Sequence, residues 1–172
     1  MIKSQVEQAL NDQLNKEAYS AYLYFSMSAW LGSRSLSGFS HWMYNQGLEE
    51  LTHVQRFFDY IQQRGGTVQL ARIDGPPVAW DSPVILFEET LAHEEMVTES
   101  VNHLVRVARE AMDHATEIFL QWFVTEQVEE EESVGLVLSR LKMAEGNPSA
   151  IMMLDAEMGR RVAPSAAETG DA

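Results

Sequence analysis

Four glutamates and one histidine of this chain occupy positions where apolar residues are expected. In each long tract, residues at alternating spacings of three and four form a seam that is otherwise largely apolar. Each seam carries one glutamate near its middle, and a histidine follows the second glutamate by one helical turn on the same face. The five residues are Glu17, Glu50, His53, Glu94 and Glu130.

Carboxylates that are buried together require a compensating charge. Without cations, their burial would cost many kcal/mol, and the groups would shift their pKa values and become neutral instead. Two divalent cations would balance four carboxylates, with His53 as a neutral ligand. Carboxylate oxygens and one imidazole suit iron, manganese or zinc, and redox chemistry with dioxygen then requires iron or manganese. The pattern predicts a two-metal site where the four seams meet.

Each of these residues also has a plainer interpretation. Glu17 alone is typical of the surface of an amphipathic helix, and Glu50 belongs to an acidic pair in which either member could face solvent. Glu130 lies in the acidic run 129–132, which is typical of a solvated face but spans more than a full turn, so one member must point inward. His53 alone is more often a satisfied core histidine. The convergence of four seams favours the metal site.

Tyr24 shares the seam of Glu17 and lies two turns further along. Core packing with a bonded hydroxyl is one interpretation, and hydrogen bonding or electron donation to the metals is the other. The remaining histidines have no seam position beside a carboxylate and are predicted to lie at the surface or at an interface. They are His41, His93, His103 and His114.

Long helices must position these residues, because proline and glycine are scarce and clustered along the chain. The expected helices span about residues 4–33, 36–64, 83–111, 114–144 and 149–160. Ser82 followed by Pro83 is typical of a helix start, and Asp113 can cap the fourth helix. Segment 66–81 is predicted to be a long extended connection, and the tail 164–172 is expected to be frayed.

Two helical hairpins joined by one long crossover make an all-α four-helix bundle, here with a short C-terminal fifth helix. The chain has 172 residues, which fits a single domain, 1–172. There are no cysteines, so disulfides and thiolate metal sites are excluded. No signal peptide or membrane span is recognised, and a cytoplasmic protein is expected. The formal net charge of −14 disfavours nucleic acid and anionic lipid and favours cations.

The motifs resemble those of the prokaryotic non-haem ferritins over nearly the whole chain. The ferroxidase pattern of that family has a glutamate in helix one, Glu-x-x-His in helix two, a glutamate in helix three and Gln-x-x-Glu in helix four, at matching spacings. The residues that carry the resemblance are Glu17-Ala18-Tyr19, Tyr24, Glu49-Glu50-Leu51-Thr52-His53, Glu94 and the segment from Gln121 to Glu130.

The resemblance implies a ferritin-like bundle that stores and detoxifies iron. Such a protein oxidises Fe(II) with dioxygen or peroxide, as a ferroxidase, and keeps the Fe(III) mineral inside a homo-oligomeric cage of 24 subunits. By the same resemblance, Glu17, Glu50 and His53 would bind the first iron. Glu50, Glu94 and Glu130 would bind the second, with Glu50 bridging the two.

Further positions follow from the same family pattern. Gln127 would lie beside the irons and position dioxygen or water. Glu49, Glu126 and Glu129 match a third iron position found in some bacterial ferritins, and the alternative is that they simply face the cage interior. Thr52 stands where bacterioferritins place a haem-ligating methionine, so no haem is expected.

Other classes remain as alternatives. A di-iron oxidoreductase of the peroxidase type could use the same bundle without storage, but many such enzymes carry a second Glu-x-x-His or cysteine-containing electron-transfer modules, which this sequence lacks. DNA-binding miniferritins lack the fifth helix expected here. A metal-free helical bundle with a structural role is the third class, and it would take up no iron.

Overall fold

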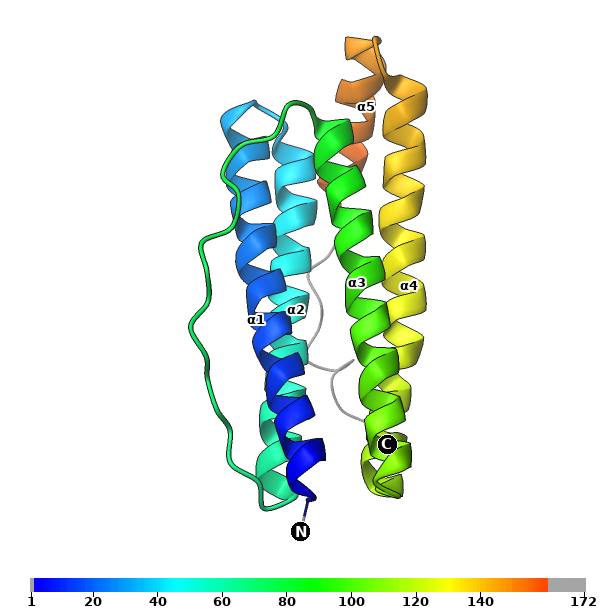
Figure 1. Ribbon diagram of the computed structural model, residues 1–172. Helices are drawn as coiled ribbons and strands as arrows, with labels where there is room; N and C mark the ends of the chain where they lie inside the picture. The colour runs from blue at the N-terminus through cyan, green and yellow to red at the C-terminus, as the bar shows by residue number, and fades with distance from the viewer. Residues whose placement is uncertain (1, 161–172) are drawn as a thin grey trace.

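The computed structural model describes residues 2–160, which form helices and no strand. The helices are α1 (Ser4–Ser33), α2 (Ser37–Gln63), α3 (Pro83–Glu110), α4 (His114–Ala144) and α5 (Pro148–Met158). Helices α1 and α2 form one hairpin, and α3 and α4 form the second (Figure 1). The expected four-helix bundle with one long crossover and a short fifth helix is confirmed.

Side chains at the helix starts explain where three helices begin. The hydroxyl of Ser82 accepts a hydrogen bond from the backbone N–H of Ile85 at 3.2 Å, with proline in the first turn of α3. Asp113 caps α4 in the same way. Asn147 caps α5, so this helix begins at Pro148, where 149 was expected. It ends at Met158, where 160 was expected.

The other differences at helix ends are single residues. Helix α2 begins at Ser37 and ends at Gln63, where 36–64 was expected, and α3 ends at Glu110, one residue early. The expected frayed tail 164–172 lies outside the described residues. None of the described helices is both long enough and apolar enough to cross a membrane.

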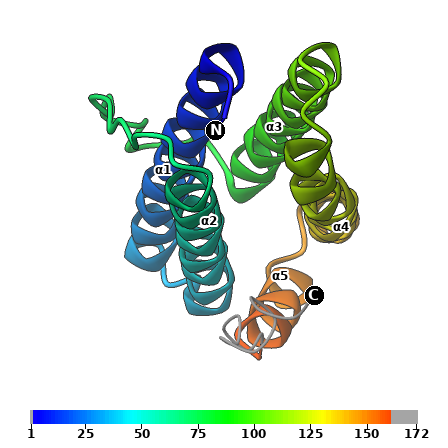
Figure 2. The same ribbon diagram turned by 90° about the horizontal axis from the view of Figure 1, so that it is seen from below.

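The long connection between the hairpins follows the outer side of α1 along its length (Figures 1 and 2). Two asparagines one turn apart on α1 hold its backbone. Asn11 accepts from the N–H of Gln69 at 2.6 Å, and its amide donates to the carbonyl of Thr67 at 3.0 Å. Asn15 repeats this pattern with Ala71 and Gln69. The extended connection therefore obtains backbone partners from side chains of a helix.

Two hydrophobic clusters fill the bundle, one toward each end. The cluster nearer α5 contains Trp30 and Phe39, and the other contains Leu10 and Phe57. On every long helix, the stretch between the two clusters contains a residue predicted to bind metal. The apolar core is therefore interrupted at mid-height, where the polar site lies.

Candidate metal centre

The polar layer between the two clusters is closed to solvent. Its five predicted ligands come from four helices, and none is more than 4% exposed: Glu17, Glu50, His53, Glu94 and Glu130. Four buried carboxylates in one layer are costly unless hydrogen bonds, protons or cations compensate their charge. The inward orientation expected from the seams is therefore present in the structure.

Three of these residues converge closely. The Nδ1 atom of His53 lies 3.2 Å from Oε2 of Glu50 and 3.9 Å from Oε2 of Glu17. One potential ligand atom from each residue lies within 4.8 Å of the others. A cation between them would replace these contacts with coordination bonds.

Two atoms of this group lack partners. Oε2 of Glu17 and Nε2 of His53 are buried without a hydrogen bond. The other carboxylate oxygen of Glu17 accepts from the amide of Gln13 at 2.8 Å. A buried carboxylate oxygen without a partner loses its hydration with no compensation, and a bound cation would supply it. These residues therefore fit a divalent metal such as iron.

Glu94 lies beside this group and is held by hydrogen bonds. The Tyr24 hydroxyl donates to Oε1 of Glu94. The amide of Gln127 donates to Oε2 of Glu94 at 3.3 Å and to the hydroxyl of Thr98 at 3.2 Å. Tyr24 is fully buried, so its ring packs in the core while its hydroxyl orients a predicted ligand.

Glu130 is oriented from the opposite hairpin. The amide of Gln46 on α2 donates to Oε2 of Glu130 on α4 at 2.6 Å. The sequence prediction did not include Gln46 or Gln13 among the site residues. Gln46 lies in the apolar seam of α2, one turn before Glu50, and Gln13 lies one turn before Glu17 but beside its seam; the spacing to a glutamate was the available signal.

The site perturbs the proton affinity of its own groups. Burial raises the pKa of Glu50 well above its usual value, and the negative charges of Glu17 and Glu94 raise it further. Burial also raises the pKa of Glu94 to about 7, although its bonds from Tyr24 and Gln127 lower it. Without metal, the site thus retains protons that a cation would displace.

The two aromatic groups of the site shift in the directions that favour their neutral forms. Burial lowers the pKa of His53, which keeps its imidazole neutral, as a metal ligand must be. Burial, followed by the negative charges of Glu94 and Glu50, raises the pKa of Tyr24 and keeps its hydroxyl a donor.

A second group of potential ligands lies on the α4 side. His53, Glu126 and Glu130 each offer one ligand atom within 4.8 Å of the others, and Glu126 is half-buried. Of the residues matched to a third iron position, the structure brings only Glu126 into this group. Glu49 is half-buried and Glu129 is exposed, and neither belongs to it.

The predicted second ligand set, Glu50, Glu94 and Glu130, is less compact than the first. None of the ligand groups within 4.8 Å among the described residues contains Glu94. Gln127 and Tyr24 engage both of its oxygens instead. In this arrangement, Glu94 would need to reorient or exchange hydrogen bonds to coordinate a metal.

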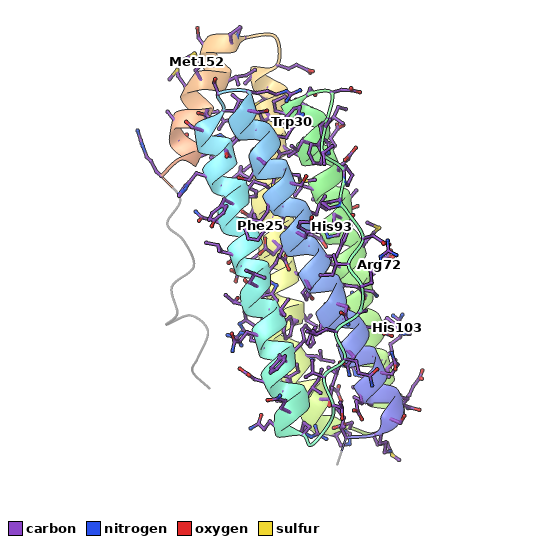
Figure 3. All side chains as sticks on the ribbon, turned by 90° about the vertical axis from the view of Figure 1, so that its left-hand side faces the viewer. Phe25, Trp30, Arg72, His93, His103 and Met152 are labelled. Atoms are coloured by element: carbon purple, nitrogen blue, oxygen red, sulfur yellow. The ribbon has the colours of Figure 1, made fainter. Side chains whose placement is uncertain are left out.

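His93, which was predicted to lie at the surface or at an interface, packs partly into the bundle. It is half-buried, its Nε2 atom lies 2.8 Å from the Ser20 hydroxyl, and its ring meets that of Tyr24 edge-on at 5.8 Å (Figure 3). Its position directly before Glu94 in the sequence could have drawn attention to it. His93 thus packs behind the site and fixes the ring whose hydroxyl holds Glu94.

Comparisons with known proteins show which family the chain resembles. A family model described as a ferritin-like domain matches residues 7–144. A bacterial non-heme ferritin of Bacteroides fragilis (strain 638R) is 38% identical over 161 residues, which are 94% of this chain and 100% of that protein. Another, of Escherichia coli O157:H7, is 34% identical over 158 residues, covering 92% of this chain and 96% of that one.

Solved structures give the same result. An open-pore ferritin from the hyperthermophilic archaeon Archaeoglobus fulgidus has a TM-score of 0.93 and 43% identity, and the match covers 94% of this chain and 100% of that one. A closed form of that ferritin, engineered by site-directed mutagenesis, has a TM-score of 0.94 at 43% identity, covering 95% and 100%. The similarity in sequence and backbone therefore extends over nearly the whole chain.

Proposed function

The chain belongs to the ferritin-like family of iron-storage proteins, and we propose that it oxidises Fe(II) at the site between its four long helices and stores the Fe(III) product in a hollow shell of 24 copies. The observation that carries the proposal is the unpartnered, buried Oε2 of Glu17 beside His53 and Glu50. Iron is the substrate and the stored cargo of this reaction.

The residues divide into ligands and supports. Glu17, Glu50 and His53 would hold one iron, and Glu50, Glu94 and Glu130 would hold the other, with Glu50 shared. The two Fe(II) ions would displace the protons held by Glu50 and Glu94, whose pKa values are raised by burial. Each Fe(II) gives one electron to dioxygen or peroxide, and the carboxylates stabilise the more highly charged product.

Amide and hydroxyl groups would keep the ligands in place during this reaction. Gln13 fixes Glu17, and Gln46 fixes Glu130. Tyr24 and Gln127 would release or share Glu94 as metal binds. Support of this kind commonly changes metal affinity or activity by about 10–100-fold when it is removed.

Substitution of Glu50 by glutamine tests the assignment. Glu50→Gln keeps the size of the side chain and removes the shared carboxylate. We expect the initial rate of aerobic Fe(II) oxidation to fall on the order of tenfold or more. Glu132→Gln is the matched control, because Glu132 is exposed in the acidic run 129–132 of α4 and its loss changes the net charge equally. An unchanged rate in Glu50→Gln would show that the site is assigned wrongly.

Storage requires a shell, which a small enzyme would not form. We expect light scattering to give about 24 times the subunit mass of 19.4 kDa, and aerobic loading to leave many iron atoms per subunit with the assembled species. A monomer or dimer that oxidises iron and retains only the bound pair would point to the peroxidase-type alternative.

A further inference from the structure

Arg56 is a cationic side chain directly beside the site, although it belongs to neither predicted ligand set. It follows His53 by one turn on α2 and is half-buried. Its guanidinium carbon lies 3.8 Å from the ring centroid of Trp122 on α4. The Trp122 ring in turn meets the His53 ring edge-on, with 5.4 Å between centroids. One aromatic ring therefore separates the cation from a predicted metal ligand.

The charge of Arg56 acts on Glu126. Burial lowers the pKa of Arg56, and the Glu126 carboxylate opposes this shift because the two opposite charges attract each other. Glu126 follows Trp122 by one turn on α4, so the stacked guanidinium and the carboxylate lie on the same side of that helix. Glu126 is also the member that completes the second ligand group, with His53 and Glu130.

The two ligand groups compete for one histidine. A neutral imidazole has a single nitrogen lone pair available for a metal. His53 belongs both to the group with Glu17 and Glu50 and to the group with Glu126 and Glu130. An ion held firmly by the second group would therefore take His53 away from the first.

We propose that Arg56 is a positioning residue whose charge competes with metal ions for Glu126. The group of His53, Glu126 and Glu130 therefore binds cations only weakly and transiently. The inference rests on the proposed function, since it concerns ions that reach or leave the oxidation site. A fixed positive charge and an incoming cation compete for the same carboxylate. Stacking on Trp122 holds the guanidinium in place, and lysine cannot reproduce that planar contact.

Zinc is a suitable probe because it is not oxidised. Calorimetric titration of the metal-free full-length protein with Zn(II) should show tight binding at the predicted pair and a weaker additional event. Arg56→Met keeps an unbranched side chain against Trp122 but removes the charge. We expect it to strengthen the weaker event by about tenfold and to leave the tight binding unchanged. Arg56→Lys, which keeps the charge but loses the planar contact with Trp122, should give a gain smaller than that of Arg56→Met.

A double-mutant cycle assigns the effect to Glu126. In a Glu126→Gln background, removal of the Arg56 charge should no longer strengthen the weaker event. Arg56→Gln supplies a second uncharged variant in case the methionine variant does not fold, as judged by thermal unfolding. An unchanged weaker event in both uncharged variants, or an equal gain with and without Glu126, would overturn the inference. If the parent protein itself shows no tight Zn(II) binding, the proposed function is refuted instead.

Discussion

Single residues in the polar layer reduce the stability of the fold. Glu50 is 1% exposed, and its raised pKa means that its negative charge is unfavourable where it lies. Hydrophobic residues at the same seam positions would pack without such a cost. A protein that keeps four buried carboxylates trades stability for a ligand set, which is common at functional sites.

This trade predicts opposite effects of one substitution on stability and on activity. Glu50→Gln removes the cost of protonating this buried carboxylate on folding and should stabilise the metal-free protein by roughly 1–3 kcal/mol at neutral pH. Calorimetric melting of the metal-free proteins measures the difference, with Glu132→Gln as the surface control. If Glu50→Gln melts at a lower temperature than the parent protein, the carboxylate stabilises the fold and does not destabilise it.

The raised pKa of Glu94 predicts how stability changes with pH. Because its folded value of about 7 lies above the ordinary 4.5, the metal-free folded protein binds more protons than the unfolded chain between these values. The free energy of unfolding should therefore fall as pH rises through this window. Melting temperatures measured from pH 5 to 8 should decline in the parent protein, and Glu94→Gln should reduce the slope.

The protons that the metal-free site retains should also be detectable when metal binds. Since a cation displaces them, affinity should rise with pH through about 7, and binding should release protons. Titrations with Zn(II) in buffers of different ionisation enthalpy count the released protons. A release that does not differ between the parent protein and Glu94→Gln would contradict this assignment.

At this scale the sequence predicted that the four glutamates and His53 are buried, because a charged residue in an apolar seam is visible in the pattern itself. It did not predict Gln13 or Gln46, since amides are common on helices and their roles depend on which rotamer reaches a carboxylate. It also did not predict the contacts of His93 with Ser20 and Tyr24, because no periodicity indicates them. Metal binding by the predicted set stays a prediction.

Among the elements, α5 is attached to the bundle by an unusual contact. The backbone N–H of Phe39 in the first turn of α2 donates to the Asp155 carboxylate of α5 at 2.9 Å. Helix α2 has no capping side chain of its own. A Cβ atom on Gly38 would lie 1.6 Å from the carbonyl oxygen of Asp155. The carboxylate thus caps α2 from another helix, at a distance that only glycine allows.

Two substitutions should therefore loosen α5 while leaving the four long helices folded. Gly38→Ala forces the two backbones apart, and Asp155→Ala removes the capping acceptor, at a cost of about 1 kcal/mol. Hydrogen exchange should accelerate within α5 and the first turn of α2 in both variants. Asp155→Asn is the control, because its carbonyl can still accept the bond. Unchanged protection of α5 in Gly38→Ala would show that the close approach does not hold it.

The elements themselves were predictable to within two residues at each end, because Ser82, Asp113 and the breaks at glycine and proline are local signals. The docking of α5 was not predictable, since it depends on the approach of two backbones that are distant in sequence. The fastening of the connection by Asn11 and Asn15 also follows from tertiary structure, as asparagine on a helix surface usually faces water.

For the whole molecule, one side bears several exposed apolar residues after folding, and others lie on α3, α4 and α5. Helices α1 and α2 and the connection form this side, which faces the viewer in Figure 3. Its exposed apolar residues are Tyr22, Tyr44, Leu51, Leu70 and Val78, with between 46% and 78% of their surface accessible. We expect this side to associate, because exposed apolar residues are frequent at association surfaces, and a surface that meets its own copy forms a twofold dimer.

Membership of the family supports homo-oligomeric assembly in general. The surface through which copies of this chain would meet stays a prediction. This reasoning leads to a prediction that separates assembly from chemistry.

Leu51→Glu places a charge at an exposed position of α2, on the side formed by α1, α2 and the connection. A twofold contact on this side would bring two such charges together. We expect the variant to sediment as a small species instead of a shell, because burying an unpaired charge costs more than the lost apolar contact. Met96→Glu adds the same charge at an exposed position on α3 and should still assemble. Tight Zn(II) binding should survive in Leu51→Glu, since its ligands come from within one subunit, whereas retention of mineral should be lost. An intact shell in this variant would place the contact on another side of the molecule, and loss of zinc binding with an unchanged helical spectrum would mean that the metal site depends on a neighbouring copy.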